Sequence, residues 1–258
     1  MGKNKLKKFA DMERFECVLQ YPREELIKSG FPYRGHWNGE LFGTSRPLVL
    51  ELGCGRGEYT VGLARRDVNR NFVGIDIKGA RMWAGARTVE EEKIDNARFL
   101  RCEIENIEHF FAPDEVDELW ITFPDPQMQK VRKRLTSSRF LGLYRKLLRP
   151  GGIVNLKTDS PFLYEYTRRL IHLNGLEVLT DSDDIYGKGF SAADDMYGSG
   201  MDDPVRSIKT YYEQQWLSRG KQIRLLRFRL PSQQQLPEIQ EPDMQDVPKD
   251  DYRSTKGR

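Results

Sequence analysis

The sequence predicts an α/β fold, in which a mostly parallel sheet carries helices on both faces and ends in an antiparallel last strand. Short apolar segments rich in β-formers alternate with amphipathic segments of helical periodicity along most of the chain. The apolar segments are nearly continuous, as in strands buried on both faces. A glycine-rich turn at 53–57 follows the first of them, which is typical of sheets that bind a ligand at the strand ends.

The first half of the chain contains four of the predicted strands. A helix is expected at 11–20, and Pro47 precedes an apolar strand at 48–52. The glycine turn then leads into an amphipathic helix at 58–66. The same change between continuous apolar runs and helical spacing predicts strands at 71–76, 97–102 and 116–123 and helices at 80–93 and 105–111.

The second half continues this alternation. A helix at 137–148 is expected to end at the Pro150-Gly151-Gly152 turn, because proline and glycine do not continue a helix. A strand at 153–157, a helix at 161–173 and a strand at 176–180 follow. Side chains of the last predicted strand, 224–230, alternate with period two.

Length and composition divide the 258 residues into one large domain with two appendages. Residues 1–46 are polar and turn-rich and are expected to form a basic arm with a helix, and 47–230 form the domain of the sheet. Residues 231–258 are rich in Gln, Pro and Asp with few apolar residues, which predicts a disordered tail.

Several classes of protein are excluded by composition. Three cysteines without a CxxC spacing and three scattered histidines indicate neither a disulfide framework nor a metal site. No apolar run approaches the roughly 20 residues of a membrane span, and the amino terminus lacks the apolar stretch of a signal peptide. A cytoplasmic protein without membrane contact is expected, and both a monomer and a homodimer are compatible with the sequence.

Charge is unevenly distributed although the net charge is only +3. Residues 126–158 contain nine basic residues and no acid, and residues 205–229 contain seven basic residues and one acid. Residues 181–203 show the reverse, with seven Asp and one Lys. Such blocks are commonly solvated faces, but two of them beside a ligand-binding edge favour a polyanionic partner.

The glycine turn has the pattern E-x-G-x-G-x-G, formed by Glu51, Gly53, Gly55 and Gly57. A dinucleotide fingerprint would read G-x-G-x-x-G and needs no acid in the strand. A carboxylate at Glu51 suits the ammonium group of an amino acid, and Asp76 at the end of the next strand suits ribose hydroxyls. Together they favour S-adenosylmethionine (AdoMet) over NAD. Cys54 is interpreted as a small filler of the turn.

Two further acids follow later strands. Glu103 comes after the strand at 97–102, where it would border an adenine or simply be a surface acid that starts a helix. Asp125 stands between Pro124 and Pro126 after the strand at 116–123. It would serve as a turn former on one interpretation, but its place at the carboxyl end of a strand favours a function.

At three places the sequence resembles the tRNA (guanine-N7-)-methyltransferases. The segments are Phe123-Pro124-Asp125-Pro126 with the basic run that ends in Lys133-Arg134-Leu135-Thr136, then 155–159 around Lys157-Thr158-Asp159, and 208–213 with Gly220. They occur in family order, and the resemblance extends from about residue 37 to residue 230. It implies a Rossmann-like class I methyltransferase fold.

The resemblance also implies roles for individual residues. Glu51, Asp76, Glu103 and Asp125 would contact AdoMet, and Asp125 would be catalytic. The family's substrate contacts fall on Asp159, on Thr210, Tyr211, Tyr212 and Glu213, and on a lysine that is Gln129 by count and Lys130 by chemistry. Gln127 stands where the family has Trp. Lys130 to Arg134, Arg139 and the amino-terminal lysines would bind phosphates.

The activity that the resemblance implies is methyl transfer from AdoMet to N7 of a guanine in the variable loop of tRNA, which forms 7-methylguanosine. Two other readings stay open at this point. One is an AdoMet-dependent methyltransferase that acts on another RNA base, a small molecule or a protein. The other is an RNA-binding module without catalysis that retains an AdoMet fold.

Overall fold

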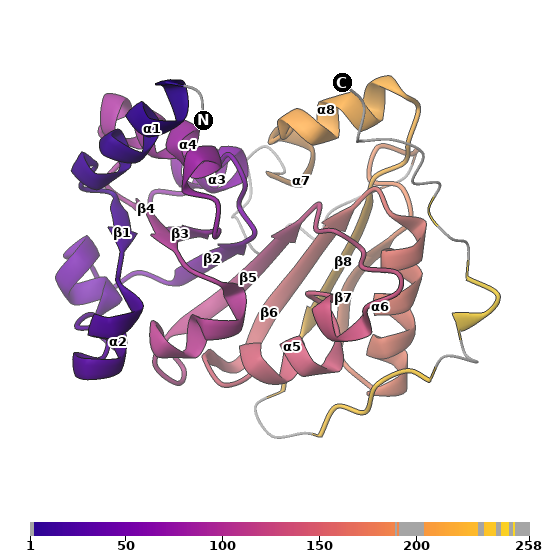
Figure 1. Ribbon diagram of the computed structural model, residues 1–258. Coiled ribbons are helices and arrows are strands. Elements are labelled where there is room, and N and C mark those ends of the chain that lie inside the picture. Colours follow the sequence, from indigo (N-terminus) through magenta and orange to yellow (C-terminus); the bar gives the residue numbers. More distant parts are fainter. Residues whose placement is uncertain are drawn as a thin grey trace.

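The computed structural model describes residues 3–188, 190, 204–231, 235–240, 244–247 and 250. Within these ranges the chain forms one sheet of eight strands in the order β1-β4-β3-β2-β5-β6-β8-β7 (Figure 1). The strands are β1 (Val18–Gln20), β2 (Leu48–Leu52), β3 (Asn71–Ile75), β4 (Ala97–Arg101), β5 (Val116–Thr122), β6 (Leu148–Thr158), β7 (Val178–Ser182) and β8 (Arg224–Arg229).

The α-helices are α1 (Lys3–Arg14), α2 (Arg23–Ser29), α3 (Glu58–Arg66), α4 (Gly79–Glu92), α5 (Ser138–Tyr144), α6 (Pro161–Leu173), α7 (Pro204–Ser207) and α8 (Tyr211–Ser218). Three helical segments of other types complete the described elements: the π-helix η1 (Trp37–Phe42) and the 3-10 helices η2 (Ile104–His109) and η3 (Val131–Lys133).

The predicted fold class is confirmed. Strands β1 to β6 pair in parallel, whereas β8 runs antiparallel to both β6 and β7. Alternate side chains of the central strands enter two separate hydrophobic clusters. One cluster joins the sheet to α5 and α6, and the other joins it to α3 and α4. The sheet is therefore buried on both faces, which explains the nearly continuous apolar runs of the sequence.

The amino-terminal segment differs from the prediction, and the helix expected at 11–20 is wrong in its second half. Helix α1 ends at Arg14, and Val18–Gln20 forms the parallel edge strand β1 beside β4. The carbonyl of Cys17 accepts a hydrogen bond from the Phe99 amide at 2.7 Å. Pairing with an existing strand outweighs the helical preference of so short a segment, because propensity is a weak prior.

The bounds of three elements in the second half are also corrected. Helix α5 ends at Tyr144, before the predicted end, and β6 begins at Leu148, so that the Pro150-Gly151-Gly152 turn lies inside an irregular strand. Gly151 has a φ of 74°, which glycine adopts without strain. The strand predicted at 176–180 lies at 178–182.

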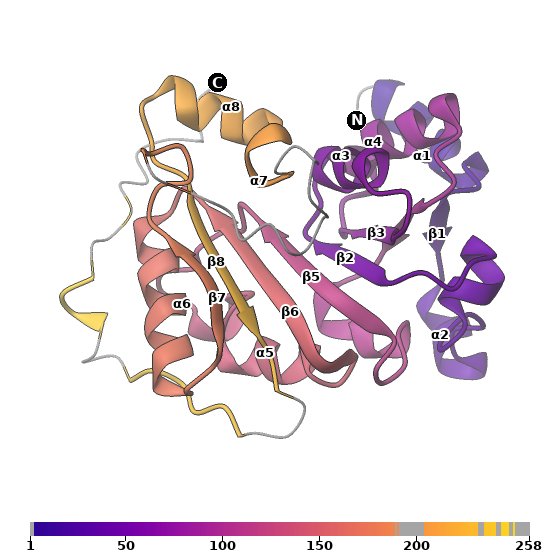
Figure 2. The same cartoon turned by 180° about the vertical axis from the view of Figure 1, so that it is seen from behind.

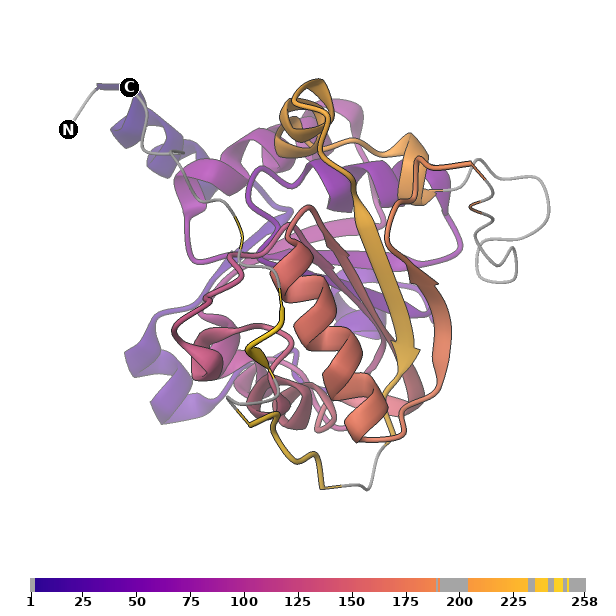
Figure 3. The same cartoon turned by 90° about the vertical axis from the view of Figure 1, so that its right-hand side faces the viewer.

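The tail predicted to be disordered contacts the body at several described residues (Figure 3). Glu238 accepts hydrogen bonds from the Ser138 amide at 3.0 Å and the Tyr166 hydroxyl at 2.6 Å. Asp250 accepts from the Ser160 hydroxyl at 2.5 Å and the Phe162 amide at 3.2 Å. Both acids thus accept hydrogen bonds from backbone amides in the first turns of α5 and α6, where amides have no acceptor within the helix. The amino-acid composition of the tail does not reveal these contacts. Residues 251–258 lie outside the described ranges.

We predict that Glu238→Ala lowers the free energy of unfolding by about 1–3 kcal/mol, because the hydroxyl of the buried Tyr166 and the α5 amide lose their acceptor. Urea denaturation of the full chain measures the change. Asp246→Ala is the matched control, since this tail acid meets Arg169 at 2.8 Å on the open surface. Equal midpoints for both variants and the unmodified chain would show that the tail is not docked.

Candidate active site at the carboxyl edge of the sheet

The carboxyl ends of β2 to β6 meet at one edge of the sheet, with α7 and α8 lying above the ends of β5 and β6 (Figures 1 and 2). The topology places all the predicted site residues at this edge or on the segments that follow it. Glu51 is the penultimate residue of β2, Asp76 follows β3, and Asp159 follows β6. Glu103 and Asp125 lie two and three residues beyond their strands.

The glycine turn between β2 and α3 has the backbone that its sequence predicted. Gly53, Gly55 and Gly57 have φ values of 75°, 55° and 72°. A Cβ at Gly53 would meet nothing within 4 Å, whereas one at Gly57 would lie 2.6 Å from Phe99. The first position therefore leaves open space beside the backbone, and the last allows α3 to pack closely on the sheet.

Asp76 ties the turn to the end of β3. One of its carboxylate oxygens accepts from the Gly55 amide at 2.9 Å, and the other accepts from the Lys78 amide at 2.7 Å. Ile77 beside it is 49% exposed. An open glycine turn, a carboxylate and an exposed apolar residue fit a nucleoside with an amino acid group. Sequence analysis did not select Ile77, because a single isoleucine after a strand carries no signal.

Glu51 is buried and engaged on both carboxylate oxygens. It accepts hydrogen bonds from the Thr60 amide at 2.8 Å, the Thr60 hydroxyl at 2.5 Å and the Thr122 hydroxyl at 2.6 Å. Burial raises the pKa of Glu51 to about 7, against the lowering effect of these three donors. Burial also raises the pKa of Cys54, so its thiol stays protonated, which agrees with a filler rather than a nucleophile.

We predict that the Glu51 carboxyl makes the folded chain less stable as pH rises. Its pKa is higher in the folded than in the unfolded chain, so its favourable contribution is complete below pH 4.5 and is lost as pH rises to about 7. A raise from 4.5 to about 7 corresponds to roughly 3 kcal/mol at 1.36 kcal/mol per pKa unit.

The Glu51→Gln variant measures this contribution, because glutamine keeps the shape and does not titrate. Its unfolding free energy relative to the unmodified chain should increase between pH 4.5 and 7.5, as followed by urea denaturation at four pH values. Parallel pH profiles for the two proteins would contradict the raised pKa.

Glu103 and Asp125 are exposed at the edge. Glu103 accepts a hydrogen bond from the Asn106 side chain at 3.3 Å. Asp125 accepts from the Gln127 amide at 3.1 Å, and its loop is flanked by Phe123 and Gln127 with φ values of 49° and 46°. Two non-glycine residues in the left-handed region indicate a loop that its surroundings hold in one conformation.

Arg134 is one of the groups that hold this loop. Its guanidinium donates to the carbonyls of Gln127 at 3.1 Å and Met128 at 2.5 Å and lies 4.5 Å from the centre of the Tyr166 ring. Arg134 is only 3% exposed. The expectation that it binds a phosphate is therefore wrong, because the buried guanidinium is used to fix the loop after Asp125. Gln129, Lys130, Arg132, Lys133 and Arg139 are exposed.

The Thr210–Glu213 segment forms the start of α8. The Thr210 hydroxyl accepts from the Glu213 amide at 3.2 Å and caps the helix. Tyr211 and Tyr212 are 45% and 39% exposed, with ring centres 5.7 Å apart. Glu213 points inward and is fully buried against Lys157. Asp159 lies at the surface, where Lys221 approaches it at 2.7 Å.

Sequence analysis gave no role to Lys157, Thr60, Thr122 or Tyr186, although each binds a carboxylate of the site. For Lys157 a signal was present: a lysine in an otherwise apolar strand must find a counter-charge. Thr60, Thr122 and Tyr186 are of residue types too common in the sequence to be selected without a motif.

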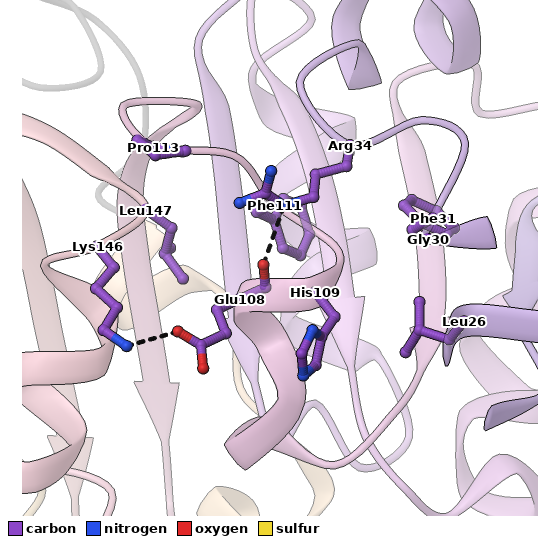
Figure 4. A pocket seen from close by; sticks show the side chains of 10 residues that line it. All are labelled: Leu26, Gly30, Phe31, Arg34, Glu108, His109, Phe111, Pro113, Lys146 and Leu147. Atoms are coloured by element: carbon purple, nitrogen blue, oxygen red, sulfur yellow. Dashed lines mark hydrogen bonds and ion pairs between the residues drawn. The ribbon is translucent and has the colours of Figure 1, made fainter. Parts of the chain in front are cut away.

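A cavity of about 790 Å³ lies away from this edge and contains none of the predicted site residues (Figure 4). Its lining includes Phe31, Arg34, Glu108 and Lys146, and Lys146 pairs with Glu108 at 2.6 Å.

None of the helices in the described ranges combines the length and apolar character that a membrane span needs. These ranges also hold no group of three or more His, Cys, Asp or Glu side chains suited to a metal ion.

The fold, a mostly parallel sheet covered by helices on both faces with an antiparallel end, is that of the class I methyltransferases. A family model described as putative methyltransferase matches residues 45–226. A solved 16S rRNA methyltransferase, KamB, shares the fold with a TM-score of 0.55 at 14% identity, covering 83% of this chain and 95% of its own.

Closer relatives define the family. The chain is 54% identical to a tRNA (guanine-N7-)-methyltransferase of Porphyromonas gingivalis, over 94% of this chain and 95% of that protein. It is 50% identical to a protein of the same name from Bacteroides thetaiotaomicron, over 98% and 95%. The chain belongs to the tRNA (guanine-N7-)-methyltransferase family, as its motifs predicted, and membership implies AdoMet as the cofactor.

Proposed function

We propose that this protein transfers a methyl group from AdoMet to N7 of a guanine in the variable loop of tRNA and so forms 7-methylguanosine. The observation that carries the proposal is the position of Asp125: an exposed carboxylate, rigidly held at the carboxyl edge, next to a turn that fits AdoMet. The relatives at 54% and 50% identity support tRNA as the substrate.

Different residues of the edge would bind different parts of AdoMet. Asp76 would accept the ribose hydroxyls, and the apolar Ile77 would cover a face of the adenine, which Glu103 borders. The buried Glu51 would provide the negative charge for the methionine ammonium, and the open side of Gly53 would let the ligand approach the backbone. AdoMet supplies the electrophilic methyl group.

Guanine N7 has a free lone pair, so methylation requires no deprotonation, and the product ring carries a positive charge. Asp125 would therefore act by orientation and charge rather than as a base. Its carboxylate can accept hydrogen bonds from the N–H groups of guanine and stabilise the charge that develops on the ring. Placing N7 in line with the methyl group supplies much of the remaining rate.

The direct test is transfer of tritium-labelled methyl from AdoMet to unmodified tRNA, followed by nucleoside analysis. We expect 7-methylguanosine, and no labelled product from a tRNA in which the variable-loop guanine is replaced by adenine. A different labelled nucleoside would overturn the assignment of the base. Absence of label, with AdoMet still bound, would overturn tRNA as the substrate.

Asp125→Asn should lower kcat for methyl transfer by about 100-fold or more, because the charge opposite the methylated ring is lost. The affinity for AdoMet, measured by calorimetry, should stay within about tenfold. Asp114→Asn is the matched control, an exposed turn aspartate before β5 with a φ of 60°. Normal turnover in Asp125→Asn would remove Asp125 from the reaction.

Lys130→Gln should weaken tRNA binding and reduce the steepness with which binding falls as salt rises, by about 0.7–0.9 in the logarithmic slope for one lost phosphate contact. Filter binding at several salt concentrations measures both. Lys28→Gln, a change on the surface of α2, serves as control. An unchanged slope for Lys130→Gln would show that Lys130 does not contact the RNA backbone.

A further inference from the structure

A buried ion pair lies beneath the start of α8. Lys157 and Glu213 are each 0% exposed, and the two carboxylate oxygens of Glu213 lie 2.7 and 2.8 Å from the Lys157 ammonium. The ammonium also donates to the carbonyls of Val205 at 2.5 Å and Ile208 at 3.3 Å. One lysine of β6 thus holds α7, the segment after it and α8 together.

Glu213 has a further donor on its other side. The Tyr186 hydroxyl donates to Glu213 at 2.8 Å and lies 3.3 Å from the Arg206 carbonyl. The aromatic rings of Tyr59 and Phe123 are centred 5.2 and 5.9 Å from the Lys157 ammonium. The ammonium and carboxylate therefore sit in a polar network with aromatic walls, which is the setting in which a buried charge pair is tolerated.

The pair is adjacent to the carboxyl edge of the sheet and to the loop that contains Asp125. Lys157 is the register partner of Thr122, and its carbonyl accepts from the Phe123 amide at 2.8 Å, two residues before Asp125. The same Thr122 donates to Glu51. On the far side, Glu213 follows the exposed Tyr211 and Tyr212, whose placement above the edge depends on where the first turn of α8 is held.

Direct contact between Glu213 and RNA does not fit this arrangement. The carboxylate is inaccessible, and turning it toward the surface would leave the Lys157 ammonium buried without a counter-charge, which is strongly unfavourable. We propose that Glu213 is a positioning residue, not an RNA ligand: through Lys157 it fixes the start of α8 so that Thr210, Tyr211 and Tyr212 face the tRNA. This inference rests on the proposed function.

A double-variant experiment separates positioning from contact. Glu213→Gln and Lys157→Met each leave one buried partner alone, whereas Lys157→Met/Glu213→Gln removes both charges and retains an acceptor for Tyr186. Each single variant should raise KM for tRNA about tenfold or more, with KM for AdoMet nearly unchanged. In the double variant no charge is left uncompensated, although the Val205 and Ile208 carbonyls lose their donor, so KM for tRNA should fall at least threefold below that of either single variant without reaching the unmodified value.

The matched control is the exposed pair Lys146 and Glu108, which has the same residue types at 2.6 Å on another surface. Lys146→Met/Glu108→Gln and its single variants should leave both KM values unchanged. A folded double variant at position 157 and 213 that remains as impaired as Glu213→Gln would overturn the proposal, since a lost RNA contact cannot be restored by changing Lys157.

Circular dichroism shows whether the variants of Lys157 and Glu213 fold. If they do not, a milder variant tests the proposal. Tyr186→Phe removes only one donor to Glu213, and KM for tRNA should then rise about threefold with KM for AdoMet unchanged. An unchanged KM for tRNA in this variant would overturn the proposal. Loss of tRNA methylation by the unmodified enzyme would instead overturn the proposed function.

Discussion

The contact between the Lys157 ammonium and the Glu213 carboxylate is the interaction on which the arrangement of the active edge depends. Both charges are removed from water, so neither can be given up without leaving the other uncompensated. The pair joins the central strand β6 to helices that follow it by about fifty residues in the sequence. A short helix such as α8 has little stability of its own, and this attachment determines where its first turn lies.

The pair belongs to a row of polar groups that crosses the carboxyl edge on one face of the sheet. Thr60 and Thr122 donate to Glu51, Thr122 pairs in register with Lys157, and Lys157 binds Glu213. The row connects the part of the edge that we propose binds AdoMet to the part that we propose faces the tRNA. Parallel strands bring these residues to one edge whatever their distance in sequence, and burial in the low dielectric of the sheet strengthens each contact between them.

The central sheet and the acidic residues of the edge were predictable from the sequence because their signals are local. Apolar runs identify β2 to β5, three glycines in five residues identify the turn, and two prolines mark Asp125. The failures have a different origin. Strand β1 exists only because β4 offers it a partner, and the tail docks through Glu238 and Asp250 on helix ends that are distant in sequence. Glu213 points inward and Arg134 is buried because of tertiary contacts, which the hydrophobic periodicity of the sequence cannot predict.

The chemistry explains why so many side chains of this site position others. Guanine N7 needs no base to remove a proton, so the barrier is lowered mainly by alignment and by charge placed where the ring becomes positive. The mechanism that we propose tolerates little movement of Asp125. The loop accordingly holds Phe123 and Gln127 in the left-handed region, and the buried Arg134 binds the carbonyls of Gln127 and Met128. Backbone strain of this kind persists only where the surroundings enforce it, and here Arg134 on one side and Lys157 on the other supply that constraint.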